Sequence, residues 1–160
     1  VKNKLGEIEI LVNNIGGPPP GTFESHSDED WQNAINLTLM SALRMSQAVL
    51  PSMKKKKWGR IVNISSDLSV IAPDQRLYWQ EGLPDNLQAV KPVTYSVIKT
   101  GLIGLTRYLS TYWIDKGIRA NSLSPGGVFN NQDEEFLKRI KTLIFGNGSI
   151  THLKKIFWDP

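Results

Sequence analysis

A tyrosine and a lysine four residues apart, Tyr95 and Lys99, form the pair in this sequence whose spacing could support acid–base chemistry. On a helix, residues four positions apart lie on one face, so the phenol and the ammonium can be neighbours. A free tyrosine titrates near pH ~10, and an adjacent cation favours the ionised phenol, which suits proton transfer near neutrality. Many surface helices contain this spacing by chance, so the pair alone is more often structural than catalytic.

Three short apolar stretches, residues 8–12, 60–66 and 118–123, are expected to be strands. Polar or glycine-containing residues stand at or just after their ends, in the order Asn-Asn-Ile-Gly, Ser-Ser and Ser-Pro-Gly-Gly. In an open parallel sheet the carboxyl ends of the strands lie at one edge, where ligands bind, and glycine there lets a ligand approach the backbone. These turns and the tyrosine–lysine pair are therefore expected to surround one crevice.

Helical segments separate the strands. Ser27 followed by three acidic residues is typical of a helix start, and apolar residues at helical spacing extend this helix to about Met53. Its expected core residues are Trp31, Ile35, Ala42, Met45 and Val49. A second helix is expected from Tyr95 to about Trp113, and residues 134–144 could form a short amphipathic one. This alternation predicts an α/β fold with a parallel sheet.

Composition excludes several kinds of site and partner. The chain has 160 residues, a formal net charge of +4 and no cysteine, which excludes disulfides and thiolate metal sites. The lysine run 54–57 falls at the expected end of the first helix and indicates a solvated helix end, not a nucleic-acid surface. His26 and His152 are isolated, which predicts no metal site. Without a bilayer-length apolar run or a signal peptide, we expect a cytoplasmic protein with no nucleic-acid or membrane partner.

The order of the motifs resembles the short-chain dehydrogenase/reductase family. The matching segments are Asn-Asn-x-Gly, Ile-Val-Asn-Ile-Ser-Ser, Tyr-x-x-x-Lys and Asn-Ser-Leu-Ser-Pro-Gly, and together they span about residues 5–130. The resemblance implies an incomplete Rossmann-like, three-layer α/β fold with a parallel sheet. It also implies NAD or NADP as cofactor, with hydride transfer between C4 of nicotinamide and a carbinol or carbonyl carbon.

The resemblance assigns roles to individual residues. Tyr95 would donate or accept the hydroxyl proton, Lys99 would favour the ionised phenol and bind the nicotinamide ribose, and Ser66 would hold the substrate oxygen. The positions that match cofactor-contacting residues of the family are Asn14, Gly16, Tyr95, Lys99, Pro125, Gly126 and Val128.

Two parts of the family pattern are missing from this sequence. The first strand, its glycine-rich turn and the residue that reads the adenosine ribose have no counterpart, so the preference for NAD or NADP is open. The final strand of the family is also unmatched. We therefore expect a partial Rossmann-like domain over residues 1–145 and an atypical tail over residues 146–160, and no saturable NAD or NADP binding by these 160 residues alone.

Two smaller departures concern the mechanism and the substrate. Thr38 occupies a position where many family members have an asparagine that organises a proton-relay water, although its backbone carbonyl could still serve. The interval from Ser66 to Tyr95 is longer than usual, and its inserted segment, residues 67–93, includes Asp74, Arg76, Tyr78 and Trp79. This segment is similar to members associated with bacterial surface-sugar and flagellin-glycan synthesis, which suggests a sugar derivative as substrate.

Two functions from different classes remain open at this point. The first is an NAD(P)-dependent oxidoreductase of a small alcohol or carbonyl compound, a homo-oligomer when full length. The second is a degenerate or truncated relative that has no activity and acts only through protein contacts. An in-frame glycine-rich strand-turn-helix encoded upstream would favour the first.

Overall fold

The computed structural model describes residues 6–127 and 131–145. Within them the chain forms a parallel three-stranded sheet in the order β1 (Ile10–Asn13), β2 (Gly59–Ile64), β3 (Ile118–Leu123). Ile10 is opposite Arg60, and Gly59 is opposite Ile118. The expected parallel α/β fold is confirmed, and β1 begins two residues later than the sequence pattern predicted.

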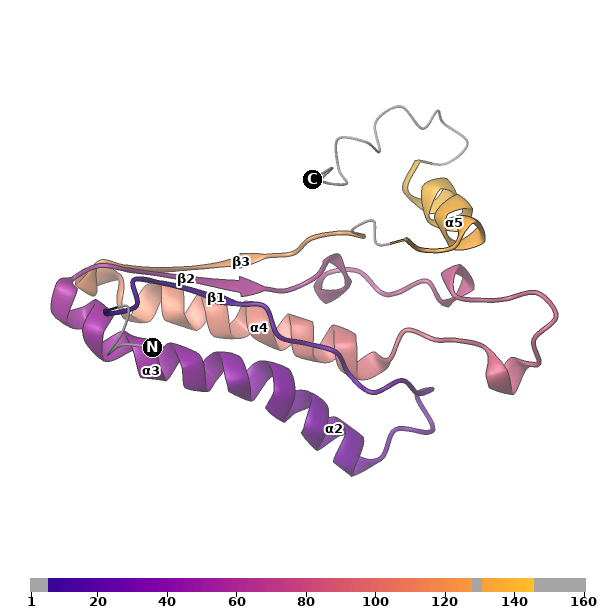
Figure 1. The fold of residues 1–160 in the computed structure, drawn as a ribbon, viewed down its shortest axis with the longest axis horizontal. Helices are drawn as coiled ribbons and strands as arrows, with labels where there is room; N and C mark the ends of the chain where they lie inside the picture. The colour runs from indigo at the N-terminus through magenta and orange to yellow at the C-terminus, as the bar shows by residue number, and fades with distance from the viewer. Residues whose placement is uncertain (1–5, 128–130, 146–160) are drawn as a thin grey trace.

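One face of the sheet is buried and the other is exposed in the described residues. Side chains of alternate strand positions point toward α3 (Ser41–Lys56) and α4 (Val93–Tyr112), which lie on the same side of the sheet (Figure 1). The opposite face exposes Ile10, Val12 and Leu123. Apolar residues on both faces are typical of a parallel sheet covered on both sides. The described residues thus supply two of the three layers that were expected.

The core lies between the sheet and these two helices. Its fully or largely buried members come from all three strands and both helices: Leu11, Val49, Leu50, Met53, Ile61, Leu109, Ile118 and Ala120. Leu105 and Trp113 pack against this cluster. Helix α4 begins just after Pro92, two residues earlier than expected.

The first helical unit begins at the predicted cap. Ser27 caps α2 (Asp28–Ala34), because the Asp30 amide donates to Ser27 Oγ at 3.2 Å and the Ser27 amide donates to the Asp30 carboxylate at 3.0 Å. This reciprocal pair satisfies two backbone donors that would otherwise be free at a helix start. The Ser27 hydroxyl also donates to Asp30 Oδ2 at 2.7 Å, and this bond and the one from the Ser27 amide lower the pKa of Asp30.

A π-helical turn, η1 (Ile35–Met40), interrupts the helix that the sequence predicted as continuous. A π turn holds one extra residue, so every residue after it is rotated relative to a regular α-helical pattern. Ser46 lies on the buried face of α3 with Ala42 and Val49, whereas the adjacent Met45 is exposed. The prediction of Met45 as a core residue was therefore wrong. Ala42 and Val49 are buried as predicted. Helix α3 ends at the exposed lysine run, as expected for a solvated helix end.

The turn between α4 and β3 depends on one glycine. Gly117 has φ +69°, in the left-handed region, and a Cβ there would collide with the carbonyl oxygen of Lys57. Only glycine combines this backbone conformation with such a close approach. The turn places the start of β3 beside the start of β2, which sets their register.

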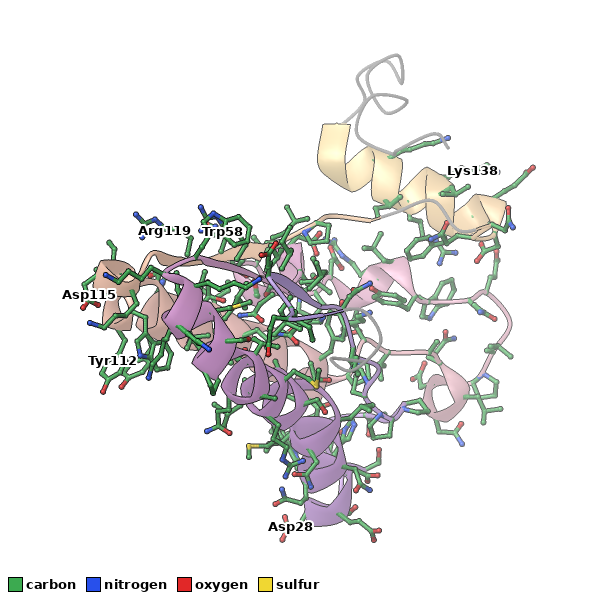
Figure 2. The ribbon with its side chains drawn as sticks, turned by 60° about the vertical axis from the view of Figure 1, so that its left-hand side comes forward. Asp28, Trp58, Tyr112, Asp115, Arg119 and Lys138 are labelled. Carbon is green, nitrogen blue, oxygen red and sulfur yellow. The ribbon has the colours of Figure 1, made fainter. Side chains whose placement is uncertain are left out.

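The long segment between β2 and α4 contains three short 3-10 turns, η2 (Asp67–Ser69), η3 (Gln75–Leu77) and η4 (Asp85–Leu87). Helix α5 (Glu134–Phe145) packs near η3. The rings of Tyr78 and Phe136 lie 5.7 Å apart between centroids. Figure 2 shows α5, with its labelled Lys138, at the opposite end of the molecule from Trp58, Asp115 and Arg119. In the part of the chain described, no helix is long and apolar enough to cross a membrane.

Candidate active site

A cavity of about 280 Å³ lies where the carboxyl ends of the strands meet α4. Its lining includes every predicted site residue that the structure describes: Asn14, Gly16, Ser66, Tyr95, Lys99, Pro125 and Gly126. Val128, the remaining predicted cofactor contact, lies outside the described residues, as does the expected tail, residues 146–160. The expectation that the turns and the tyrosine–lysine pair surround one crevice is therefore met by the geometry.

The two serines after β2 have different partners. Ser65 connects the strands and the helix, because its amide donates to the Leu123 carbonyl at 2.7 Å and its Oγ donates to the Lys99 carbonyl at 2.7 Å. Ser66 is buried, and its Oγ donates to Asp67 Oδ1 at 2.8 Å and accepts the Leu68 amide at 3.2 Å. Ser65 thus fixes the end of β2 on α4, while Ser66 remains on the wall of the cavity.

Lys99, the lysine of the predicted pair, forms part of the cavity wall. Lys99 is buried, its Nζ donates to the Ile64 carbonyl at 2.8 Å, and it is 5.7 Å from the centre of the Tyr95 ring. Burial lowers the pKa of Lys99, and the nearby ammonium of Lys91 lowers it further. The helical spacing has placed phenol and ammonium on one face, as predicted.

Gly16 allows close packing above this lysine. A Cβ at Gly16 would lie 3.4 Å from Lys99 Nζ and 3.6 Å from Thr38 Oγ1. Because Gly16 has no side chain, this wall of the cavity is formed by backbone atoms and by the Lys99 ammonium. Thr38 is buried in the π-helical turn, and its carbonyl accepts the Ser41 amide.

A buried polar chain holds the sheet and α4 together, and sequence reasoning missed it. Asn13 Nδ2 donates to Asn63 Oδ1 at 2.8 Å, Asn63 Nδ2 donates to Thr106 Oγ1 at 2.8 Å, and Thr106 Oγ1 donates to the Leu102 carbonyl at 2.7 Å. An asparagine inside an otherwise apolar strand was the available signal. These hydrogen bonds fix α4 against β1 and β2, and Asn13 and Asn63 directly precede two residues that line the cavity, Asn14 and Ile64.

Replacing Asn63 by leucine should lower the free energy of unfolding by about 1–3 kcal/mol, because the buried Asn13 amide loses its acceptor. Urea denaturation measures this change. Asn121→Leu, at an exposed position of β3, is the matched control and should change stability by less than about 0.5 kcal/mol. Equal stability of both variants would show that the network contributes nothing.

Lys91 also lies at the site, and sequence reasoning did not identify it. Its Nζ lies 4.0 Å from the centre of the Tyr95 ring. Tyr78 is nearby and half-buried; burial raises its pKa, and the charges of Asp67 and Tyr95 raise it further. The only available signal was the position of Lys91 in the inserted segment, four residues before Tyr95.

The arrangement suits proton exchange with an oxygen atom. A phenol beside an ammonium, with a serine hydroxyl on the same cavity wall, can bind a carbonyl or alcohol oxygen and pass a proton to or from it. Within the described residues, no group of three or more histidines, cysteines or carboxylates could hold a metal ion. His26 instead forms a 2.8 Å hydrogen bond with the Thr22 carbonyl.

Two family models match successive parts of the chain. Residues 1–78 match the model described as short chain dehydrogenase, and residues 86–147 match the one described as enoyl-(acyl carrier protein) reductase. An uncharacterized oxidoreductase of Thermotoga maritima is 35% identical over 137 residues, which are 86% of this chain and 47% of that protein.

Solved structures share the fold. A short-chain dehydrogenase from Leptospira borgpetersenii with bound NAD+ has a TM-score of 0.73 at 31% identity, and the match covers 86% of this chain and 50% of that one. A gluconate 5-dehydrogenase from Burkholderia cenocepacia, in complex with NADP and tartrate, has a TM-score of 0.68 at 26% identity, with 84% and 49% covered. The chain spans about half the length of the proteins it matches. With both family models and the shared fold in agreement, this chain belongs to the short-chain dehydrogenase/reductase family.

Proposed function

We propose that the protein containing this chain is an NAD(P)-dependent oxidoreductase that interconverts an alcohol and a carbonyl compound. The observation that carries this proposal is the single cavity lined by Ser66, Tyr95 and Lys99 together with Asn14 and Gly16. These are the residues that the family pattern places around the reacting oxygen and the nicotinamide.

The residues present fit the nicotinamide end of the cofactor. At Gly16 a Cβ would lie 3.4 Å from Lys99 Nζ, so glycine leaves backbone atoms and a cation open to a ribose. The cavity, about 280 Å³, is at the lower end of ligand-site volumes of roughly 300–1,000 Å³. In this proposal it holds the nicotinamide and its ribose. The relatives with bound NAD+ and NADP support either cofactor.

Each catalytic residue has a separate task in this proposal. Ser66 Oγ donates to the substrate oxygen and orients it. The Tyr95 hydroxyl gives that oxygen a proton during reduction, or accepts one during oxidation. Lys99 favours the ionised phenol and donates to the ribose hydroxyls. The nicotinamide, when bound, supplies or accepts the hydride. Ser66 currently donates to Asp67, so substrate binding would exchange one acceptor for another.

The complete gene product, assayed with NAD+, NADH, NADP+ and NADPH, tests the proposal directly. Nicotinamide absorbance should change with an alcohol or carbonyl substrate and stay constant without it. A panel of simple ketones, hydroxy acids and sugar derivatives is the starting set. If no member of the panel gives nicotinamide-linked turnover, although the protein is folded and binds the cofactor, the oxidoreductase proposal fails.

We also propose finer properties of the whole protein. A small alcohol or carbonyl compound, in particular a sugar derivative, is the proposed substrate, because the inserted segment borders the site. A homo-oligomer is supported by the exposed rings of Tyr108 and Tyr112, which stack 5.1 Å apart on the outer side of α4. The proposed location is the cytoplasm.

A further inference from the structure

The Tyr95 ring lies near two lysine ammonium groups in the described part of the chain. Lys99 Nζ is 5.7 Å from the ring centre, and Lys91 Nζ is nearer, at 4.0 Å. Lys99 already has a role in the proposed reaction and donates to the Ile64 carbonyl. Lys91 comes from the inserted segment, and the proposed chemistry gives it no role.

The backbone of Lys91 is held in place. The side chain of Gln75 forms two hydrogen bonds with it, accepting from the Lys91 amide at 2.8 Å and donating to the Lys91 carbonyl at 3.0 Å. Pro92, which follows, is buried and precedes the first turn of α4. The backbone that carries the Lys91 side chain is therefore fixed by Gln75, which precedes it by 16 residues.

The charge of Lys91 is poorly compensated. Burial lowers the pKa of Lys91, whereas the carboxylate of Asp67 acts in the opposite direction. That carboxylate accepts from Ser66 Oγ at 2.8 Å and from the Leu68 amide at 2.7 Å. Among the described residues, no carboxylate lies within ion-pair distance of Lys91. A half-buried ammonium without a counter-ion costs free energy, and contact with an aromatic ring offsets only part of that cost.

The other groups that face this ammonium make the local charge positive. Lys99 is the second cation, and Asp67 is the one nearby anion that acts on Lys91 in the described residues. Tyr78 and Tyr95 are the remaining ionisable neighbours. A monoanionic ligand would neutralise the excess positive charge. A dianionic phosphate would leave the group with an excess negative charge, whereas a carboxylate would leave it neutral.

We propose that Lys91 binds a carboxylate carried by the substrate, so that the site takes a hydroxy acid or oxo acid whose reacting carbon lies at Tyr95. This inference rests on the proposed oxidoreductase function and specifies its substrate class. The Lys91 ammonium lies over the ring of Tyr95, whose hydroxyl exchanges the proton. It can therefore bind a carboxylate close to the reacting carbon. The hydrogen bond between Lys91 and the carboxylate would also orient the substrate so that its reacting oxygen lies at Ser66 and Tyr95.

The first test compares acids with their neutral esters in the complete protein. Lactate, glycerate and 3-hydroxybutyrate are each paired with the methyl ester. In Lys91→Met, kcat/KM for an acid substrate should fall about 10- to 100-fold, mainly through KM, since a charge-assisted hydrogen bond is lost. The ester should change less than about threefold, and Lys91→Arg should retain part of the acid activity.

The matched control is Lys116→Met, because Lys116 pairs with Asp115 at the end of the molecule opposite α5 (Figure 2). It should leave both acid and ester turnover unchanged. Retained ester turnover in Lys91→Met shows that the variant is folded. Equal losses for acid and ester, or a wild-type protein that does not favour the acids over their esters, would overturn the inference.

A second test needs neither cofactor nor turnover. Modification of lysines by an amine-reactive acetylating reagent is followed by mass spectrometry, with Lys116 as the internal reference. Lactate or 3-hydroxybutyrate should slow the modification of Lys91 several-fold, and the methyl esters should not. Absence of protection, or equal protection by the esters, contradicts carboxylate binding. If the protein turns over nothing but Lys91 is protected, the oxidoreductase proposal fails while the anion site stands.

Discussion

Replacing Tyr95 by phenylalanine should lower kcat of the complete protein by at least about a hundredfold and up to about ten-thousandfold, while the Kd for the nicotinamide cofactor changes little. The substitution removes only the hydroxyl that we propose exchanges the proton, and general acid–base groups typically contribute this much. The ring remains, so the stacking of Lys91 on it and the shape of the cavity are kept. Steady-state kinetics and calorimetric titration of the cofactor measure the two quantities separately.

Tyr108→Phe is the matched control, because Tyr108 is exposed on the same helix and its ring stacks on Tyr112. The loss of its hydroxyl should leave kcat unchanged. A Tyr95→Phe protein with wild-type kcat would show that the proton is exchanged elsewhere, and the catalytic assignment would fail. Reduced cofactor affinity in the same variant would instead show that the hydroxyl contacts the nicotinamide ribose.

Replacing Lys99 by methionine should affect both cofactor binding and the chemical step. The ammonium is proposed to donate to the ribose and to favour the ionised phenol, so the Kd for NAD(P) should rise by about tenfold or more and kcat should fall at least about a hundredfold. Lys116→Met is again the control. A Lys99→Met protein that binds cofactor normally and loses only kcat would limit this lysine to its effect on Tyr95.

The stability of the Lys99→Met protein shows whether the losses of cofactor affinity and kcat arise from unfolding. The pKa of Lys99 is lowered in the folded chain, first by burial and then by Lys91, so the unfolded chain holds this proton more tightly. The charged ammonium therefore costs stability at neutral pH, and that cost is lost as pH rises from the folded-state pKa toward the ordinary lysine value. Methionine removes the charge, so the midpoint of urea denaturation at pH 7 should not fall much. A large drop would show that the bond from Lys99 Nζ to the Ile64 carbonyl outweighs the cost of burying the charge.

The local features of the fold were predictable from short stretches of sequence. Ser27 and the acidic residues after it mark a helix start because side-chain capping is satisfied by near neighbours. The strands at residues 59–64 and 118–123 follow from apolar runs bounded by turn residues, and parallel pairing then brings Ser66, Gly126 and Asn14 to one edge. Tyr95 and Lys99 share a helix face by their spacing alone. These inferences depend on residues close in the chain, or on the rule that parallel strands end together.

Only the tertiary structure decided features that depend on partners distant in the sequence. The π-helical turn at Ile35–Met40 has no signal in the periodic pattern, and Ser46, not the adjacent apolar Met45, lies on the buried face of α3. Asn63 is satisfied by residues 50 and 43 positions away. Lys91 lies over the Tyr95 ring because Gln75 fixes its backbone. Gln75 belongs to a turn that has no periodic sequence pattern. Sequence determined which residues meet at the edge of the sheet, whereas long-range hydrogen bonds and packing decided which additional charge lies beside the Tyr95 phenol.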